Sequence, residues 1–434
     1  MRHHVLVKMR QALAEPPLIP DWITFITDKS VVVTSVNSEV DAVLLSGGYR
    51  FWVTHEYAAT RDGWTPLERQ LGLDRTYRLV LQRDAGRLPN ELVQRLAALA
   101  SVERAHQLEV GGAEMPDQRA VSVSTTQSVI GQRPLPGLDF AWAITRGRKD
   151  VQVAVLDTGV NLDHPELRGK VVAKADFVDL AGLETSSFVG DFMEADDDPE
   201  DELGHGTHVA GIIAGDGIAM DPGIAPDCRL MAVRVLATLK IGDRLQGAGV
   251  VDNINPAIKW AVDRGADVIN MSLGVRHTGG GLPHEDVIRY ALAHGVAVVA
   301  ASGNDGTNTK YYPGALPGVI AVGAVDDEDQ VTKFTSFGAQ ITVVAPGVNV
   351  LSSYAHGRYA IASGTSQASP CVAGAVALLI SLARDHDVRL GVDEIARILR
   401  ETSDKPDARL RSVHAGYGVV NMTDAVKWLL GSLN

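Results

Sequence analysis

Cysteine is scarce in this chain of 434 residues, which has only two, Cys228 and Cys371. Two cysteines exclude a disulfide framework, although a single bridge stays open. Basic residues are also in deficit, since 40 Lys and Arg face 53 Asp and Glu and give a net charge of −13. We therefore expect no nucleic-acid partner, because phosphate binding needs a basic surface. An acidic surface of this kind serves solubility.

Long apolar runs are absent as well. No stretch approaches the ~18 apolar residues of a membrane-spanning helix, and residues 1–10 lack the apolar core of a signal peptide. We therefore expect no membrane partner and a cytoplasmic location, although a secreted protein whose signal peptide had been removed would present the same sequence. What is present is ordinary for a globular chain, with 45% apolar and 21% charged residues.

Residues 138–434 predict one α/β domain. Short apolar runs alternate there with helical patterns, which implies βαβ units and a parallel sheet flanked by helices on both faces. In such sheets the catalytic groups gather at the carboxyl ends of strands and at the helix N-termini that follow. The expected strands are residues 151–156, 230–236, 267–271, 296–300 and 319–322, and the expected helices are residues 206–214, 250–264, 285–294 and 366–383.

Three residues stand at such positions, each in a distinctive context. Asp157 ends a strand run in Val-Ala-Val-Leu-Asp-Thr-Gly, His205 opens a helix in Gly-His-Gly-Thr-His-Val-Ala-Gly, and Ser366 opens another in Ser-Gly-Thr-Ser-Gln-Ala-Ser-Pro. A serine hydroxyl needs a base to remove its proton, and the base needs an acid to orient it and to stabilise its charge. The three residues therefore predict an acid, a base and a nucleophile in the chain order Asp, His, Ser.

In these three contexts the chain resembles the subtilisin-like serine proteases (subtilases, peptidase family S8), over about residues 138–430. The resemblance implies a serine endopeptidase that hydrolyses a polypeptide substrate through an acyl-enzyme, with no cofactor required for the chemistry. It also implies that Asn304, in Ala-Ser-Gly-Asn-Asp-Gly, donates a hydrogen bond to the oxyanion. The implied walls of the substrate site are Ser272, Leu273 and Gly274 on one side and Ala301, Ser302 and Gly303 on the other.

Four residues near these motifs need separate interpretation. Gln367 follows the serine where many family members have methionine, which leaves the packing behind the nucleophile open. His208 is expected to pack or hydrogen-bond near the triad, because a zinc-binding helix places its histidines at i and i+4. Cys371 is expected to be a small buried residue. The loop after the oxyanion asparagine is short and predicts an open primary pocket, which Lys310 could bias toward acidic side chains.

An acidic run precedes the histidine of the triad, and seven of the nine residues 194–202 are carboxylates. Such charges repel one another unless they are solvated or neutralised by a cation. Because Ca²⁺ takes oxygen ligands, two interpretations stay open: a structural calcium site, or a solvated acidic loop at the rim of the cleft. The candidate metal ligands are Asp196, Asp198 and Asp201.

The region before residue 138 has a different pattern and predicts a smaller α+β domain. It resembles the propeptide of many subtilases, and a Gly- and Pro-containing link follows it. We therefore expect a zymogen, in which this domain docks as an inhibitor, the link lies in the substrate cleft, and cleavage falls near residues 110–125. A permanent N-terminal domain that recruits a partner is the alternative. The expected divisions are an extension at 1–27, the propeptide-like domain at 28–112 and a linker at 113–137, with strands at 30–36, 49–55, 77–81 and 102–108 and a helix at 89–98.

Two other functional classes and one narrower function are considered. A non-catalytic pseudoprotease would bind peptides without cutting them, but such proteins typically lack a triad or oxyanion residue, and all four are present here. A sedolisin-like acid protease would carry an acid in place of His205. Within the endopeptidase class, a processing protease that matures one specific polypeptide is the narrower possibility.

Overall fold

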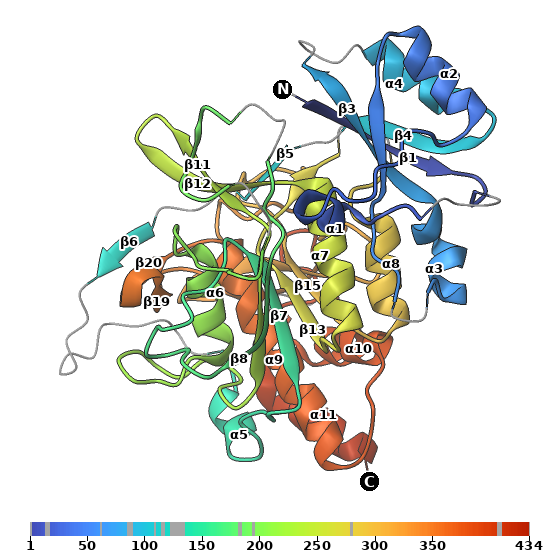
Figure 1. Ribbon diagram of the computed structural model, residues 1–434. Helices are drawn as coiled ribbons and strands as arrows, with labels where there is room; N and C mark the ends of the chain where they lie inside the picture. The colour runs from blue at the N-terminus through green and yellow to red at the C-terminus, as the bar shows by residue number, and fades with distance from the viewer. Residues whose placement is uncertain are drawn as a thin grey trace.

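The computed structural model describes residues 2–13, 18–60, 63–84, 90–107, 110–113, 118–121, 135–180, 185–192, 196–277, 281–405 and 410–433. Its largest sheet has seven parallel strands in the order β18-β17-β15-β13-β7-β10-β8 (Figure 1). All five predicted strands lie in this sheet, and the two outer strands β8 and β18 were not predicted. The strands are β7 (Gln152–Asp157), β8 (Val171–Asp176), β10 (Arg229–Arg234), β13 (Val268–Met271), β15 (Ala297–Ala301), β17 (Ile320–Val325) and β18 (Ile341–Pro346).

Helices cover both faces of this sheet, which confirms the predicted α/β class. Successive residues of β7 alternate between two apolar cores: Val153 and Val155 pack with α6, α9 and α11, whereas Ala154 and Leu156 pack with α7 and α8. The helices are α5 (Leu138–Trp142), α6 (His205–Ala214), α7 (Val251–Asp263), α8 (Glu285–Ala293), α9 (Thr365–Asp385), α10 (Val392–Thr402) and α11 (Met422–Leu433). One of them, α9, is long and apolar enough to span a membrane, but that stretch is entirely buried inside the domain.

The N-terminal region forms a second sheet, in the order β2-β3-β1-β4 (Figure 1). Its strands are β1 (Arg2–Met9), β2 (Phe51–His55), β3 (Thr76–Asp84) and β4 (Val102–Gln107), and its helices are α1 (Trp22–Thr27), α2 (Ser38–Ser46), α3 (Pro66–Leu71) and α4 (Asn90–Ala97). Helices α2 and α4 pack on one face of the sheet through an apolar core of their own. The expected strand-helix-strand pattern of β3, α4 and β4 is confirmed.

The structure corrects two details of this domain. Residues 1–27 were expected to be an extension, but β1 lies between β3 and β4 and pairs antiparallel with both. The predicted strand at 30–36 is replaced by a single bridge between Val33 and Val53. The sequence did not predict β1 because residues 2–9 find their strand partners only in segments that lie about 70 and 100 residues later.

Short strands also occur in the predicted linker and in the residues just before it. β5 (Val110–Ala113) pairs antiparallel with β12 (Arg244–Val250), and β6 (Gln118–Val121) pairs antiparallel with β20 (Arg358–Ala362). The rest of the expected linker, up to residue 134, and much of the expected cleavage range lie outside the described residues. The remaining strands are β9 (Phe188–Val189), β11 (Ala237–Ile241), β14 (Val275–Arg276), β16 (Tyr311–Tyr312) and β19 (Val350–Tyr354).

Candidate active site

Asp157 and His205 meet at the carboxyl end of β7. The Nδ1 atom of His205 lies 2.6 Å from Oδ1 of Asp157, and both side chains are buried. This approach requires a glycine, because a methyl group on Gly206 would overlap the carbonyl oxygen of Gly159 and come within 3.1 Å of Asp157 Cβ. Burial alone would lower the pKa of His205, but the Asp157 carboxylate outweighs that effect and holds it above its ordinary value.

A second buried carboxylate, Asp201, fixes the turn that leads into the histidine. Its Oδ1 accepts from Thr158 Oγ1 at 2.9 Å and from the backbone N–H groups of Leu203 and Gly204, and its Oδ2 accepts from both N–H and Oγ1 of Thr207. Thr158 in turn accepts the Gly206 N–H at 2.9 Å. Asp201 therefore satisfies N–H groups at the start of α6, where a helix has no acceptors of its own.

Ser366 stands in the first turn of α9, beside the end of β13. Its hydroxyl donates to the carbonyl oxygen of Ser272 at 3.2 Å, while Nε2 of His205 is buried with no hydrogen-bond partner among the described residues. The structure thus contains the Asp–His contact of the predicted triad, and the Ser–His hydrogen bond is not made. The Ser366 hydroxyl is directed to the Ser272 carbonyl rather than to the imidazole.

Asn270 belongs to the site although sequence reasoning passed over it. This buried side chain accepts from Ser369 Oγ at 2.8 Å and donates to Ser272 Oγ at 3.0 Å, and Ser272 Oγ donates to the Ser366 carbonyl at 2.9 Å. The network joins β13 to the first turns of α9. An asparagine inside a buried strand was the signal that could have revealed it, because a buried amide needs partners.

Asn304 lies next to the nucleophile, on the loop after β15. Its Oδ1 accepts from the backbone N–H of Thr365 at 2.8 Å and from Thr365 Oγ1 at 2.9 Å. These two bonds fix the orientation of the amide, so that Nδ2 points away from Thr365. The side chain is thereby held beside the Ser366 N–H, which belongs to the first turn of α9 and has no acceptor within the helix.

The two predicted substrate walls end neighbouring strands. Met271 pairs with Ala300, so Ser272 to Gly274 and Ala301 to Gly303 leave the same edge of the sheet side by side. Beside the first wall lies β5, which pairs with β12 on one side and contacts β14 on the other. A segment that precedes the catalytic domain therefore lies beside this edge, paired as a strand with β12.

Three residues near Ser366, namely His208, Cys371 and Gln367, are buried and differ in their hydrogen-bond partners. His208 donates from Nε2 to the carbonyl oxygens of Val350 and Ala360, and burial lowers its pKa to about 4. Cys371 and Cys228 are both buried and form no disulfide, so the single bridge left open above is not formed. Gln367 is also fully buried, and neither atom of its amide has a hydrogen-bond partner among the described residues.

The acidic run does not gather its carboxylates into one metal site. Asp201 turns inward with its oxygens taken by protein donors, whereas Asp196 and Asp198 are exposed and hydrogen-bond to each other through Asp198 N–H. In the part of the chain that the structure describes, no three His, Cys, Asp or Glu side chains are placed to hold a metal ion. Asp196, Asp198 and Asp201 therefore do not fit calcium as a joint ligand set.

Comparison with known proteins gives the same assignment as the geometry. The model of the subtilase family matches residues 148–419. The thermophilic serine proteinase of Bacillus sp. (strain AK1) is 42% identical over 67% of this chain and 65% of its own length, just under two thirds. Thermitase of Thermoactinomyces vulgaris is 37% identical over 59% of this chain and 84% of its own length.

A solved structure shares the fold. The prenylagaramide maturation protease PagA superposes with a TM-score of 0.55 at 31% identity, and the match covers 68% of this chain and 99% of that one. The chain belongs to the subtilase family of serine endopeptidases.

Proposed function

We propose that this protein cuts polypeptide chains at the edge of the sheet where β7, β13 and β15 end. His205 takes the proton of Ser366, and the Ser366 oxygen attacks the peptide carbonyl. Asp157 holds the imidazole in place through Nδ1 and stabilises its positive charge. Asn304 Nδ2 and the Ser366 N–H stabilise the oxyanion. The observation that carries this proposal is the buried Asp157–His205 contact of 2.6 Å. Helix α6, which begins at His205, packs against α9, whose first turn bears Ser366. The chemistry needs no cofactor.

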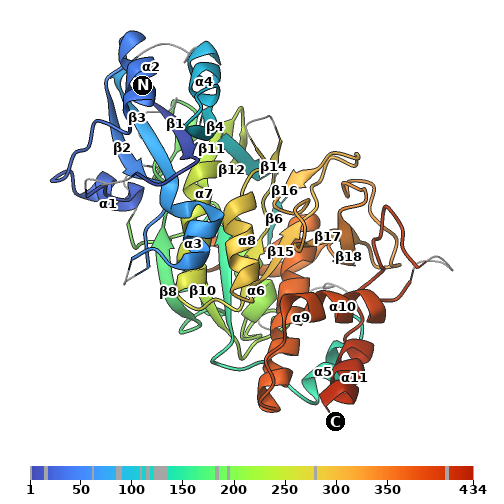
Figure 2. The same ribbon diagram turned by 90° about the vertical axis from the view of Figure 1, so that its right-hand side faces the viewer.

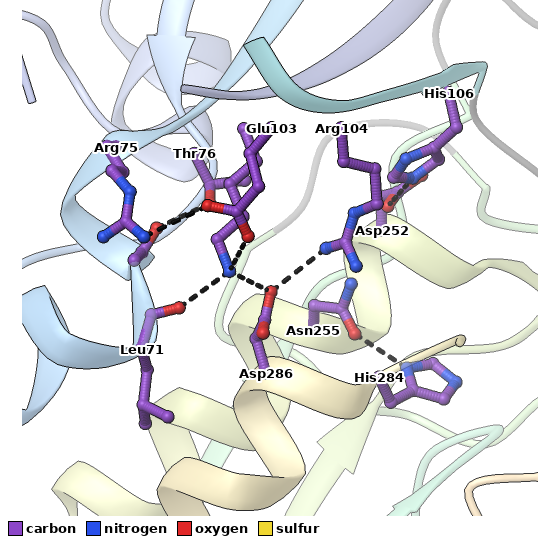
Figure 3. A network of polar contacts seen from close by, with 12 residues as sticks. Leu71, Arg75, Thr76, Glu103, Arg104, His106, Asp252, Asn255, His284 and Asp286 are labelled. Atoms are coloured by element: carbon purple, nitrogen blue, oxygen red, sulfur yellow. Dashed lines mark hydrogen bonds and ion pairs between the residues drawn. The ribbon is translucent and has the colours of Figure 1, made fainter. Parts of the chain in front are cut away.

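We further propose that the N-terminal domain is an inhibitor of this site. Its sheet has two faces, and residues on successive positions of a strand point to opposite ones. One face packs under α2 and α4, whereas Lys8, Arg78, Arg104 and His106 belong to the other face and meet α7 and α8 of the catalytic domain. Figure 3 shows Arg104 and His106 above the two helices.

Ion pairs connect the two domains at the first turns of α7 and α8. Asp286 accepts from Lys8 Nζ at 2.8 Å and from Arg104 Nη2 at 3.0 Å (Figure 3). Asp252 lies 3.3 Å from His106 Nε2. Burial opposes the charge of Asp252, but His106 and Arg78 outweigh it and keep the pKa of this carboxyl below its usual value. The positive face of the N-terminal sheet therefore matches acidic helix ends.

Apolar contacts add to this docking. Tyr57, Leu71 and Leu73 of the N-terminal domain pack in the same apolar core as residues of α7 and α8. From the docked domain the chain continues into β5, beside the predicted substrate wall. A segment that pairs with the enzyme as a strand blocks a substrate that would bind in the same way. This arrangement supports a zymogen that is cut shortly after β5, within the expected range of residues 110–125.

Intact mass of the purified full chain tests both proposals, with a fluorophosphonate label added to wild type and to Ser366→Ala. We expect only the wild type to carry the label and to be trimmed within residues 110–125, while the variant stays at full length. A labelled but untrimmed wild type would contradict the zymogen and favour a permanent N-terminal domain. An unlabelled wild type, after removal of the N-terminal domain by an added protease, would favour the peptide-binding pseudoprotease.

The likeness to PagA favours the narrower role of a processing enzyme. PagA is a maturation protease, and the present chain covers nearly all of it in the superposition. We propose that this chain likewise acts on a restricted set of polypeptides. Digestion of a mixture of denatured proteins, followed by sequencing of the cut sites, tests this, because a broad protease would cut most of them at many positions.

A further inference from the structure

The side chain of Tyr311 lies between the two predicted substrate walls. A methyl group placed on Gly303 would overlap Cδ2 and Cε2 of the Tyr311 ring. A methyl group placed on Gly274 would come within 3.0 Å of Tyr311 Cβ and 3.3 Å of its Cδ1. One aromatic side chain therefore touches a glycine of each wall, and it is only 8% exposed.

The position of the scissile bond relates the Tyr311 ring to the substrate side chain that precedes the cut. A peptide carbonyl attacked by Ser366 must lie against the Ser366 hydroxyl, which is 3.2 Å from the carbonyl oxygen of Ser272, and its oxygen must face Asn304. The side chain of the residue before the cut then leaves the peptide between Ser272–Gly274 and Ala301–Gly303. Tyr311 occupies that same space. This step rests on the proposed function, in which these walls bind the substrate.

The Tyr311 ring is held where it is from both ends. Its backbone pairs with Arg276, because β16 runs antiparallel to β14, and Figure 2 shows these two short strands beside one another. Its hydroxyl donates to Asp305 Oδ2 at 3.0 Å and accepts from Arg276 Nη2 at 2.9 Å. Asp305 is itself fixed by Ser336 Oγ at 2.6 Å. Swinging the ring out of the site would break these bonds.

The charges around the ring balance one another. Arg276 Nη2 lies 3.1 Å from Asp305 Oδ2, and the Arg276 guanidinium lies over the Tyr311 ring. Burial opposes the charge of Asp305, but hydrogen bonds from Ser336, Thr307 and Tyr311 outweigh it and lower its pKa to about 2. The ion pair is therefore present at neutral pH, and Lys310 next to it is exposed. This balance gives no net positive charge for an acidic substrate side chain.

We propose that Tyr311 is the residue that limits this protease to small side chains, such as glycine, alanine or serine, immediately before the cut. The ring fills the volume that a large apolar side chain would need. On this proposal the primary pocket is shallow, in contrast to the open pocket expected from the sequence. Selection works here by exclusion, since a packed wall rejects larger groups more strongly than it attracts small ones.

Peptide substrates that differ only in the residue before the cut test this proposal. The labelled fraction of Ser366 in the self-processed protein gives the concentration of active enzyme, and kcat/KM is then measured for alanine and phenylalanine at that position. We expect the wild type to favour alanine by about a hundredfold. Tyr311→Ala should remove most of that preference through a gain on the phenylalanine peptide, while Tyr311→Phe, which keeps the ring, should retain it.

The outcomes separate this proposal from the one on which it rests. A labelled wild type that prefers phenylalanine, or a Tyr311→Ala variant that keeps the wild-type preference for alanine, would overturn the role of the ring alone. A gain in cleavage after glutamate in Tyr311→Ala, with none after phenylalanine, would also overturn it. Absence of labelling in the self-processed or protease-treated protein would overturn the proposed function and this inference together. Thermal melting of each variant confirms that it is folded.

Discussion

Buried or partly buried carboxylates occur in two regions of this molecule, and their oxygens have different kinds of partner. In the active site, Asp201 accepts only from hydroxyl and backbone N–H groups. At the domain interface, Asp286 and Asp252 are met by Lys8, Arg104 and His106. Neutral donors have fixed directions and set a geometry, whereas opposite charges give an attraction that depends on salt and pH. The first region therefore depends on hydrogen-bond geometry, whereas the attraction in the second depends on salt and pH.

Removal of the Asp157 charge should have the largest effect and tests the active-site region of this comparison. Asp157→Asn should lower kcat by about 10⁴-fold, because the imidazole loses the partner that orients it and stabilises its charge. Activity needs neutral His205, so it should rise as the pH passes upward through the His205 pKa, which the carboxylate holds above its usual value. The acid limb of the kcat/KM profile should therefore move to lower pH in the variant. An unchanged limb would show that another group titrates there.

Loss of the hydrogen bonds to Asp201 should have the next largest effect, on the stability of the folded chain. Asp201→Asn should destabilise the folded chain by about 2–4 kcal/mol, because an amide cannot accept all five hydrogen bonds. Denaturant unfolding in the Ser366→Ala background, where self-cleavage is removed, measures this. Asp198→Asn is the matched control from the same acidic run, since Asp198 is exposed. Equal effects of the two substitutions would contradict the special role of Asp201.

The interface half of the comparison is tested at Asp286, which meets two cationic side chains of the N-terminal domain. Asp286→Ala should weaken docking by about 1.4 kcal/mol, or tenfold. Trypsin should then remove the N-terminal domain of the Ser366→Ala chain about ten times faster, with a smaller difference at high salt. Glu285→Ala is the control, because Glu285 is the neighbouring acid in the same first turn. If both variants are cut at the wild-type rate, the ion pairs do not hold the domain.

The smallest change in stability is expected at Gln367, a buried polar side chain that has neither neutral donors nor an opposite charge as partner in the described part of the chain. Both amide atoms of Gln367 are buried without a hydrogen bond from the described residues. Gln367→Met keeps the length of the side chain and removes the unsatisfied amide, so we expect a gain in stability of about 1 kcal/mol. The unfolding midpoint in the Ser366→Ala background measures it, and Gln94→Met on the exposed face of α4 serves as control. A loss of stability would show that the amide has a partner, such as a buried water.

Most of the catalytic domain was predictable because its signals are local. Strands such as β7 and β13 are continuous apolar runs that only a sheet covered on both faces explains. Asp157, His205 and Ser366 each lie in a short context that specifies both a turn and a residue type. By contrast, β1 and the weak pattern around residue 33 were misread, since strand pairing over long separations depends on partners that no local window contains.

The order of the amino acids was thus enough to indicate the parallel sheet, the three residues proposed as the triad and the presence of a smaller N-terminal domain. The packed chain was needed to show which acid of residues 194–202 turns inward, how Asn270 joins Ser272 to Ser369, and where the Tyr311 ring lies. Residue type and periodicity act within a few positions of the chain, and so they can be read locally. Burial, hydrogen-bond partners and the filling of a substrate site arise only when distant segments pack together.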